Sequence, residues 1–171
     1  MSVQQQRETL GPKLTWHVEK YGASHRTPIN MRLHYVGIPL IALGWLGLLA
    51  KVAVPEFGAP AWRTPNLGMA LLVAAAYWYL WCNWRIGLLM TAVGVAGYFI
   101  GCALSAWVLG GMFALGAALH NIGHYAFEGK PPALLSRPIA IIEAPIWLLA
   151  IMFGYSPANA DRESGSKSGT D

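Results

Sequence analysis

The chain has 171 residues, of which 55% are hydrophobic and only 12% are charged. Soluble domains carry roughly 25% charged residues on average, so this composition excludes an ordinary soluble protein and indicates one compact membrane domain. The net charge is +4, but the basic residues are scattered singly and no aromatic-basic motif accompanies them. This pattern argues against binding to nucleic acid and favours membrane-flanking anchors.

Residues 1–30 form a polar head, which lacks the basic and apolar regions of a cleaved signal peptide. A first apolar segment from Leu33 to about Val54 is long enough to span a bilayer, which needs ~20 residues. A second apolar segment covers residues 67–81. Residues 86–127 then stay apolar for too long for a single crossing, so we expect two crossings with a hinge near residues 105–111.

A fifth apolar segment, residues 139–155, contains Glu143 and Pro145, and therefore spans the membrane, re-enters it or lies along its interface. The tail, residues 156–171, has a low-complexity polar composition that predicts disorder. The fold class expected is all-α: a polytopic membrane helix bundle with about four spanning helices plus the fifth segment. Residues 1–155 would form a single membrane-embedded catalytic domain that includes the polar head.

Basic residues favour the cytoplasmic ends of membrane spans. They are most frequent in the polar head and occur again at Arg85, Lys130 and Arg137, whereas the other loops carry few or none. This distribution places the head and the Lys130 loop in the cytoplasm, with four crossings between them. His25 and His34 would then lie at the same membrane face as His120 and His124.

Those four histidines form the candidate metal site, because ionisable groups near lipid are costly unless they are paired or functional. His120 and His124 share one face of a helix, and a bend at Pro28 would let His25 and His34 converge on them. Imidazole-rich sites suit iron, zinc, copper or nickel. Five histidines are too few for the boxes of di-iron desaturases, so a single metal ion is favoured, and His17 reads as a polar anchor.

Two polar residues beside the histidines are candidate catalytic residues. Glu128 lies four residues after His124, so it could bind the metal, orient a ligating imidazole or simply pair with Lys130. We favour the orienting role, because the imidazoles already suffice for one metal ion. Asn30 could donate a hydrogen bond within the site, although a cap or turn role is equally consistent with its position.

Two stretches, "HRTPINMRLHYVGIPL" and "IGHYAFEGKPPALL", resemble the two signatures of the membrane-bound Fe(II)-dependent 2-hydroxy fatty acid dioxygenase family, formerly a domain of unknown function. The resemblance spans about residues 16–155. It implies an iron-dependent enzyme that uses oxygen to remove C1 from a 2-hydroxy fatty acid, in fatty acid alpha-oxidation. His25, His34 and His124 carry over as iron ligands. His120 departs from the family pattern, and only its spacing supports it.

The implied cofactor is Fe(II) alone, because no nucleotide, haem or flavin motif is present. The implied partners are a 2-hydroxy fatty acid, molecular oxygen and membrane lipids. The site would face the cytoplasm from the inner or plasma membrane of a bacterium, or from the endoplasmic reticulum of a eukaryote. Two alternatives remain open at this point: a zinc-dependent membrane hydrolase and a non-enzymatic lipid-binding membrane protein.

Overall fold

The regular structure of the chain is helical throughout the part that can be described. The computed structural model describes residues 3–23, 25, 27–52, 64–132 and 137–152, and these contain no β-strand. The elements in chain order are α1 (Val3–Gly22), α2 (Pro28–Ala50), α3 (Leu67–Cys82), α4 (Trp84–Ala103), α5 (Ala106–Ile122), the π-helix η1 (Gly123–Glu128) and α6 (Ala140–Met152). The expected disordered tail, residues 156–171, lies outside the described residues.

Three helical segments are long and apolar enough to cross a membrane. They are α2, α4 and the continuous helix formed by α5 and η1, Ala106–Glu128. The shorter apolar helices α3 and α6 have 16 and 13 residues. Large apolar side chains cover the outer surface, and Trp107 is 92% exposed. An apolar exterior of this kind suits lipid rather than water, so the expected all-α membrane helix bundle is confirmed.

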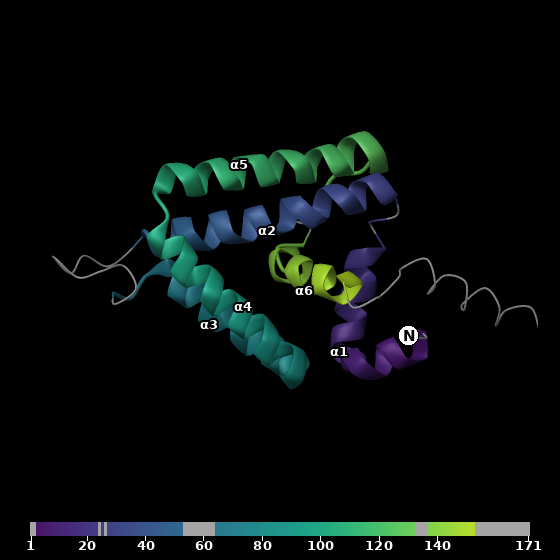
Figure 1. The fold of residues 1–171 in the computed structure, drawn as a ribbon. Coiled ribbons are helices and arrows are strands. Elements are labelled where there is room, and N and C mark those ends of the chain that lie inside the picture. The colour runs from purple at the N-terminus through teal and green to yellow at the C-terminus, as the bar shows by residue number, and fades with distance from the viewer. Residues whose placement is uncertain (1–2, 24, 26, 53–63, 133–136, 153–171) are drawn as a thin grey trace, which may run out of the picture.

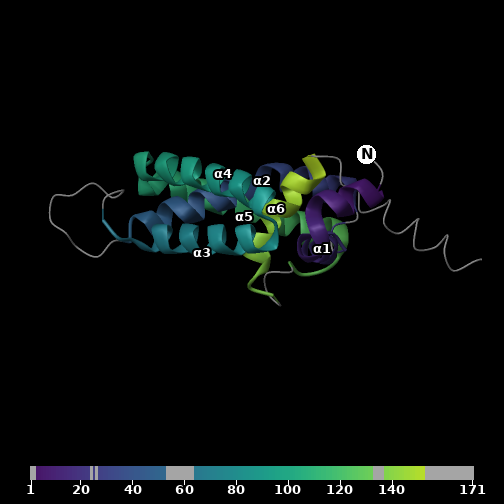
Figure 2. The same ribbon diagram turned by 90° about the horizontal axis from the view of Figure 1, so that it is seen from below.

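The four longer apolar helices form two antiparallel pairs that diverge from a common end. Helices α2 and α5 lie side by side, the hairpin of α3 and α4 runs away from them at an angle, and α6 and α1 lie between the open ends (Figure 1). Figure 2 shows α1 and α6 together at this same end of the bundle. The polar head is therefore packed onto the bundle, because α1 contacts α6.

Glycines allow α2 and α5 to approach closely. A Cβ atom added to Gly116 would lie 2.8 Å from the backbone oxygen of Gly37, closer than real Cβ contacts. Small residues are used in this way where membrane helices pack backbone to backbone. The break expected between the third and fourth spans lies at Leu104 and Ser105, where the Ser105 hydroxyl accepts a hydrogen bond from the Val108 amide and caps α5.

Asn83 fixes the tight turn between α3 and α4 and attaches α1 to it. Its side-chain oxygen caps α4 by accepting hydrogen bonds from the amides of Arg85 and Ile86. Its side-chain nitrogen donates to the backbone oxygens of Thr9 and Leu10 in α1. The polar head, this turn and the first turns of α2 are thus held at one end of the bundle.

Candidate metal centre

Three histidines from two distant parts of the chain meet in the interior. His25 precedes α2, His34 lies in its second turn, and His124 lies in η1. The exposed fractions of these residues are 0%, 0% and 1%. One ligand atom from each imidazole lies within 4.8 Å of the others, so the group could hold a metal ion. The structure therefore brings together both sequence stretches that contained the candidate ligands.

Hydrogen bonds to the backbone define the tautomers of two of these imidazoles. His25 Nδ1 lies 2.8 Å from the carbonyl oxygen of Tyr21, and His34 Nδ1 lies 2.8 Å from that of Asn30. A carbonyl only accepts, so each Nδ1 must carry the hydrogen and donate it. Burial lowers the pKa of His25 to about 4, which keeps its ring neutral. When both rings are neutral with the hydrogen on Nδ1, each Nε2 presents a lone pair.

These two lone pairs face each other, an arrangement that fits two ligands of one metal ion. The Nε2 atoms of His25 and His34 are 3.1 Å apart. Two acceptor nitrogens cannot form a hydrogen bond with each other. A cation bound by both nitrogens removes this conflict, and neutral imidazoles with their second nitrogen bonded to a carbonyl are typical metal ligands. The donor set therefore fits a metal ion that prefers nitrogen.

His124 is the third candidate ligand. Both of its ring nitrogens are buried and form no hydrogen bond within the described part of the chain. Its ring centroid lies 4.8 Å from that of His25 and 5.0 Å from that of His34. A buried polar nitrogen without a partner is costly, and binding of a metal ion would satisfy one of the two.

His120 lies beside this group. Its ring centroid is 4.4 Å from that of His34 and 4.7 Å from that of His124. Its Nδ1 is buried and has no hydrogen-bond partner among the residues that the structure describes. The fourth imidazole is thus close to the other histidines, although it is not one of the three whose ligand atoms lie within 4.8 Å of one another.

Asn30 and Glu128 link the two halves of the site. Oε1 of Glu128 accepts hydrogen bonds from the backbone amide of Thr27, from the hydroxyl of Thr27 and from Nδ2 of Asn30. Thr27 is the N-cap residue of α2, where a carboxylate also interacts favourably with the helix dipole. Glu128 therefore binds the end of η1 to the start of α2, the segment that lies between His25 and His34.

The π-helical conformation of η1 occurs where the chain reaches these histidines. Single turns of π-helix are rare and frequently lie at functional sites. Gly123, its first residue, lies against Asn30 and His34: an added Cβ would be 2.1 Å from Oδ1 of Asn30. Gly129 ends the helix in the left-handed conformation, with φ of 63°. The absence of a side chain at Gly123 thus allows η1 to lie directly against α2.

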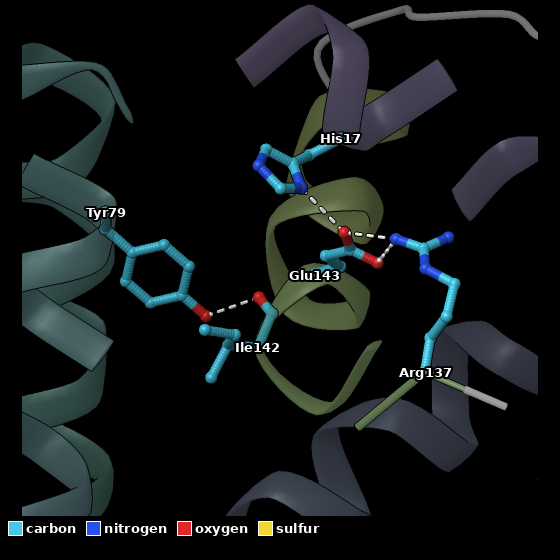
Figure 3. Close-up of polar contacts among 5 residues, drawn as sticks. All are labelled: His17, Tyr79, Arg137, Ile142 and Glu143. Carbon is cyan, nitrogen blue, oxygen red and sulfur yellow. Dashed lines mark hydrogen bonds and ion pairs between the residues drawn. The ribbon is translucent and has the colours of Figure 1, made fainter. Parts of the chain in front are cut away.

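Helix α6 covers the histidines with Trp147. This residue is fully buried, and its ring centroid lies 4.6 Å from that of His25 and 6.3 Å from that of His34. One turn earlier, the fully buried Glu143 is bound by Nη2 of Arg137, at 2.5 and 2.6 Å from its two oxygens. His17 Nδ1 lies 2.6 Å from the same carboxylate (Figure 3).

The sequence interpretation missed these contributions of α6. His17 is not part of the metal group: it binds a buried carboxylate and attaches α1 to α6. The sequence indicated only that Glu143 makes a simple membrane crossing by residues 139–155 uncertain to assign. The available signal was its position in an apolar helix, because an acidic residue there requires a partner.

The fold and site define a membrane helix bundle with a buried group of three histidines that could hold a metal ion. The sequence comparisons identify its family. The model of the family described as 2-hydroxy-palmitic acid dioxygenase Mpo1-like matches residues 13–155. The chain belongs to this family, as its two signatures predicted. No curated protein and no solved structure gives a significant match.

Proposed function

We propose that the chain is an Fe(II)-dependent dioxygenase that shortens 2-hydroxy fatty acids by one carbon. The observation that carries this proposal is the convergence of His25, His34 and His124, in a chain whose family is named for a 2-hydroxypalmitic acid dioxygenase. The bond between C1 and C2 would break, C2 would become the new carboxyl carbon, and oxygen would be the oxidant. Loss of C1 as carbon dioxide, with one water formed, balances one O₂ per acid.

The protein's own contribution would be to hold, orient and shield the reactants. His25, His34 and His124 are the proposed ligands, with His120 as a fourth, and Fe(II) would supply the centre at which the 2-hydroxy acid and oxygen react. The carbonyls of Tyr21 and Asn30 hold two of the imidazoles in the tautomer that a metal requires. Burial of His25, His34 and His124 would exclude bulk water from the reaction.

Asn30 and Glu128 are proposed as positioning residues. The Asn30 carbonyl orients His34 in α2, and the Asn30 side-chain amide donates to Glu128 in η1. The two residues therefore connect the candidate ligand in α2 with the one in η1. Glu128 would fix the start of α2 relative to η1, and hence the distance between His34 and His124. Partners that orient ligands in this way typically change affinity or activity by about 10–100-fold.

Residues 1–155 are proposed to act as one catalytic domain whose metal centre faces the cytoplasm. Basic residues occur in α1, in the first turn of α4 (Arg85) and just before α6 (Arg137), and α1 and α6 lie at the open end of the bundle (Figure 1). This distribution of charge supports a cytoplasmic orientation. The fatty acid would approach from the bilayer, into which its acyl chain partitions.

Metal analysis combined with oxygen uptake tests the proposal. Purified protein should retain iron and consume oxygen when 2-hydroxypalmitate is added, and palmitate should give no uptake. His34→Ala and His124→Ala should lose both iron and turnover, whereas His17→Ala should keep the metal. Bound zinc with oxygen-independent turnover would indicate a hydrolase instead, and variants with unchanged metal content and lipid turnover would indicate a non-enzymatic protein.

A further inference from the structure

A side chain that packs against the histidines carries an unpaired hydrogen-bond donor. Trp147 has an exposed fraction of 0%, and its indole Nε1 is buried with no hydrogen-bond partner in the described residues. The indole N–H only donates, so reorientation cannot turn it into an acceptor. Leaving such a group unpaired in the interior costs free energy. A donor left unpaired next to a proposed metal centre is the kind of group that a ligand would satisfy.

The indole is held in position from both sides of α6. Glu143, four residues before Trp147 and therefore on the same helix face, is bound by Arg137 and His17. On another side, the Tyr79 hydroxyl donates to the backbone oxygen of Ile142 at 2.8 Å (Figure 3). These contacts attach α6 to α1, to α3 and to the segment before α6. The ring of Trp147 then packs against both Tyr21 and His25, at centroid distances of 5.2 and 4.6 Å.

We infer that the indole N–H of Trp147 binds the carboxylate of the 2-hydroxy acid, an inference that rests on the proposed function. A carboxylate only accepts hydrogen bonds, so it complements a group that only donates. The positive charge of Arg137, the cation of this network, is already paired with Glu143. Trp147 is thus a specificity-determining residue that recognises the head group, while the acyl chain extends away from the histidines.

Replacement of Trp147 by phenylalanine tests this inference, because it keeps an aromatic ring and removes the N–H. The protein would be loaded with Zn²⁺ in lipid nanodiscs, so that 2-hydroxypalmitate binds without turnover and binding is measured by calorimetry. Trp147→Phe should keep its zinc but bind the acid roughly tenfold more weakly, as expected for a hydrogen bond to a charged group. The matched control is Trp107→Phe, at the most exposed tryptophan, which should bind as the wild type does.

A second measurement separates hydrogen bonding from packing. In protein labelled with ¹⁵N-tryptophan, the indole signal absent from the Trp147→Phe spectrum should move downfield when 2-hydroxypalmitate is added. An unmoved signal at saturation, or equal affinity of Trp147→Phe and wild type, would overturn the inference. If the iron enzyme still turns over the acid, the proposed function would stand. If the wild type binds no 2-hydroxypalmitate, the proposed function fails and the inference fails with it.

Discussion

Replacing Gly123 with alanine should disturb the proposed metal centre without replacing any of its candidate ligands. The backbone of Gly123 is right-handed and helical, with φ of −53°, so alanine is not strained by its own conformation. The added Cβ would lie 2.1 Å from Oδ1 of Asn30 and 3.3 Å from Cε1 of His34. Real Cβ contacts essentially never fall below 3.0 Å, so Asn30 Oδ1 or the backbone of η1 must move by about 0.9 Å, the difference between the two distances.

That movement disturbs the contacts on which the ligands depend. Asn30 donates to Glu128 through Nδ2 and accepts from His34 through its carbonyl, so its displacement changes the distance between α2 and η1. Overpacking of a well-packed interior typically costs about 1–3 kcal/mol. Loss of a group that orients a metal ligand typically weakens metal affinity by about 10–100-fold. We therefore expect a lower melting temperature together with a larger loss of iron.

Competition with a chromophoric chelator measures iron affinity directly, and oxygen uptake on 2-hydroxypalmitate measures turnover. Gly110→Ala and Gly111→Ala in α5 are matched controls, since an added Cβ there meets no described atom within 4 Å. Alanine in a helix interior is favoured over glycine by about 1 kcal/mol, so neither control should lose iron. Wild-type iron affinity in Gly123→Ala would refute the reasoning. A reduced penalty in the Asn30→Ala background would support it.

Three further outcomes are expected. Glu128→Gln should retain iron but lower turnover by about 10–100-fold, measured by oxygen uptake, and loss of the iron would show that the carboxylate binds the metal. Glu143→Gln should lower the free energy of unfolding by about 3–5 kcal/mol, as removal of a charge from a buried ion pair does. The exposed pair of Arg7 and Glu19 provides the control, since Glu19→Gln should cost at most about 1 kcal/mol. Finally, tags in the polar head and in the loop at 130–137 should both report the cytoplasm. A tag placed after Pro60 should report the opposite side of the membrane. Finding the first two tags on opposite sides would contradict the proposed topology.

The membrane-spanning helices and the histidine group could be predicted from local features of the sequence. Apolar runs of sufficient length and the polar break at Ser105 determine where α2, α4 and α5 lie, because a bilayer requires helices of a set length. The positive-inside rule then predicted that the two histidine pairs lie at one end of the bundle. His25, His34 and His124 do meet there.

The contribution of α6 could not be predicted in the same way. An apolar helix of 13 residues with a proline and a glutamate is compatible with several positions relative to a membrane. Its position depends on contacts distant in sequence: Glu143 binds His17, which lies 126 residues earlier in the chain. The π-helical turn of η1 was also missed, because the sequence pattern of a π-helical turn resembles that of an α-helix. Both features depend on tertiary packing, which local periodicity does not encode.

A four-residue spacing matters in this site in a way that the sequence did not suggest. Sequence spacing favoured His120 and His124 as a pair on one helix face, yet His25 and His34 also form a close pair, with their Nε2 atoms 3.1 Å apart. Each of these donates its Nδ1–H to the carbonyl of the residue four positions earlier, Tyr21 for one and Asn30 for the other. For His25 this carbonyl belongs to the last turn of α1, where backbone oxygens lack helical partners. The end of one helix and the first turns of the next thus direct both Nε2 atoms to the same point.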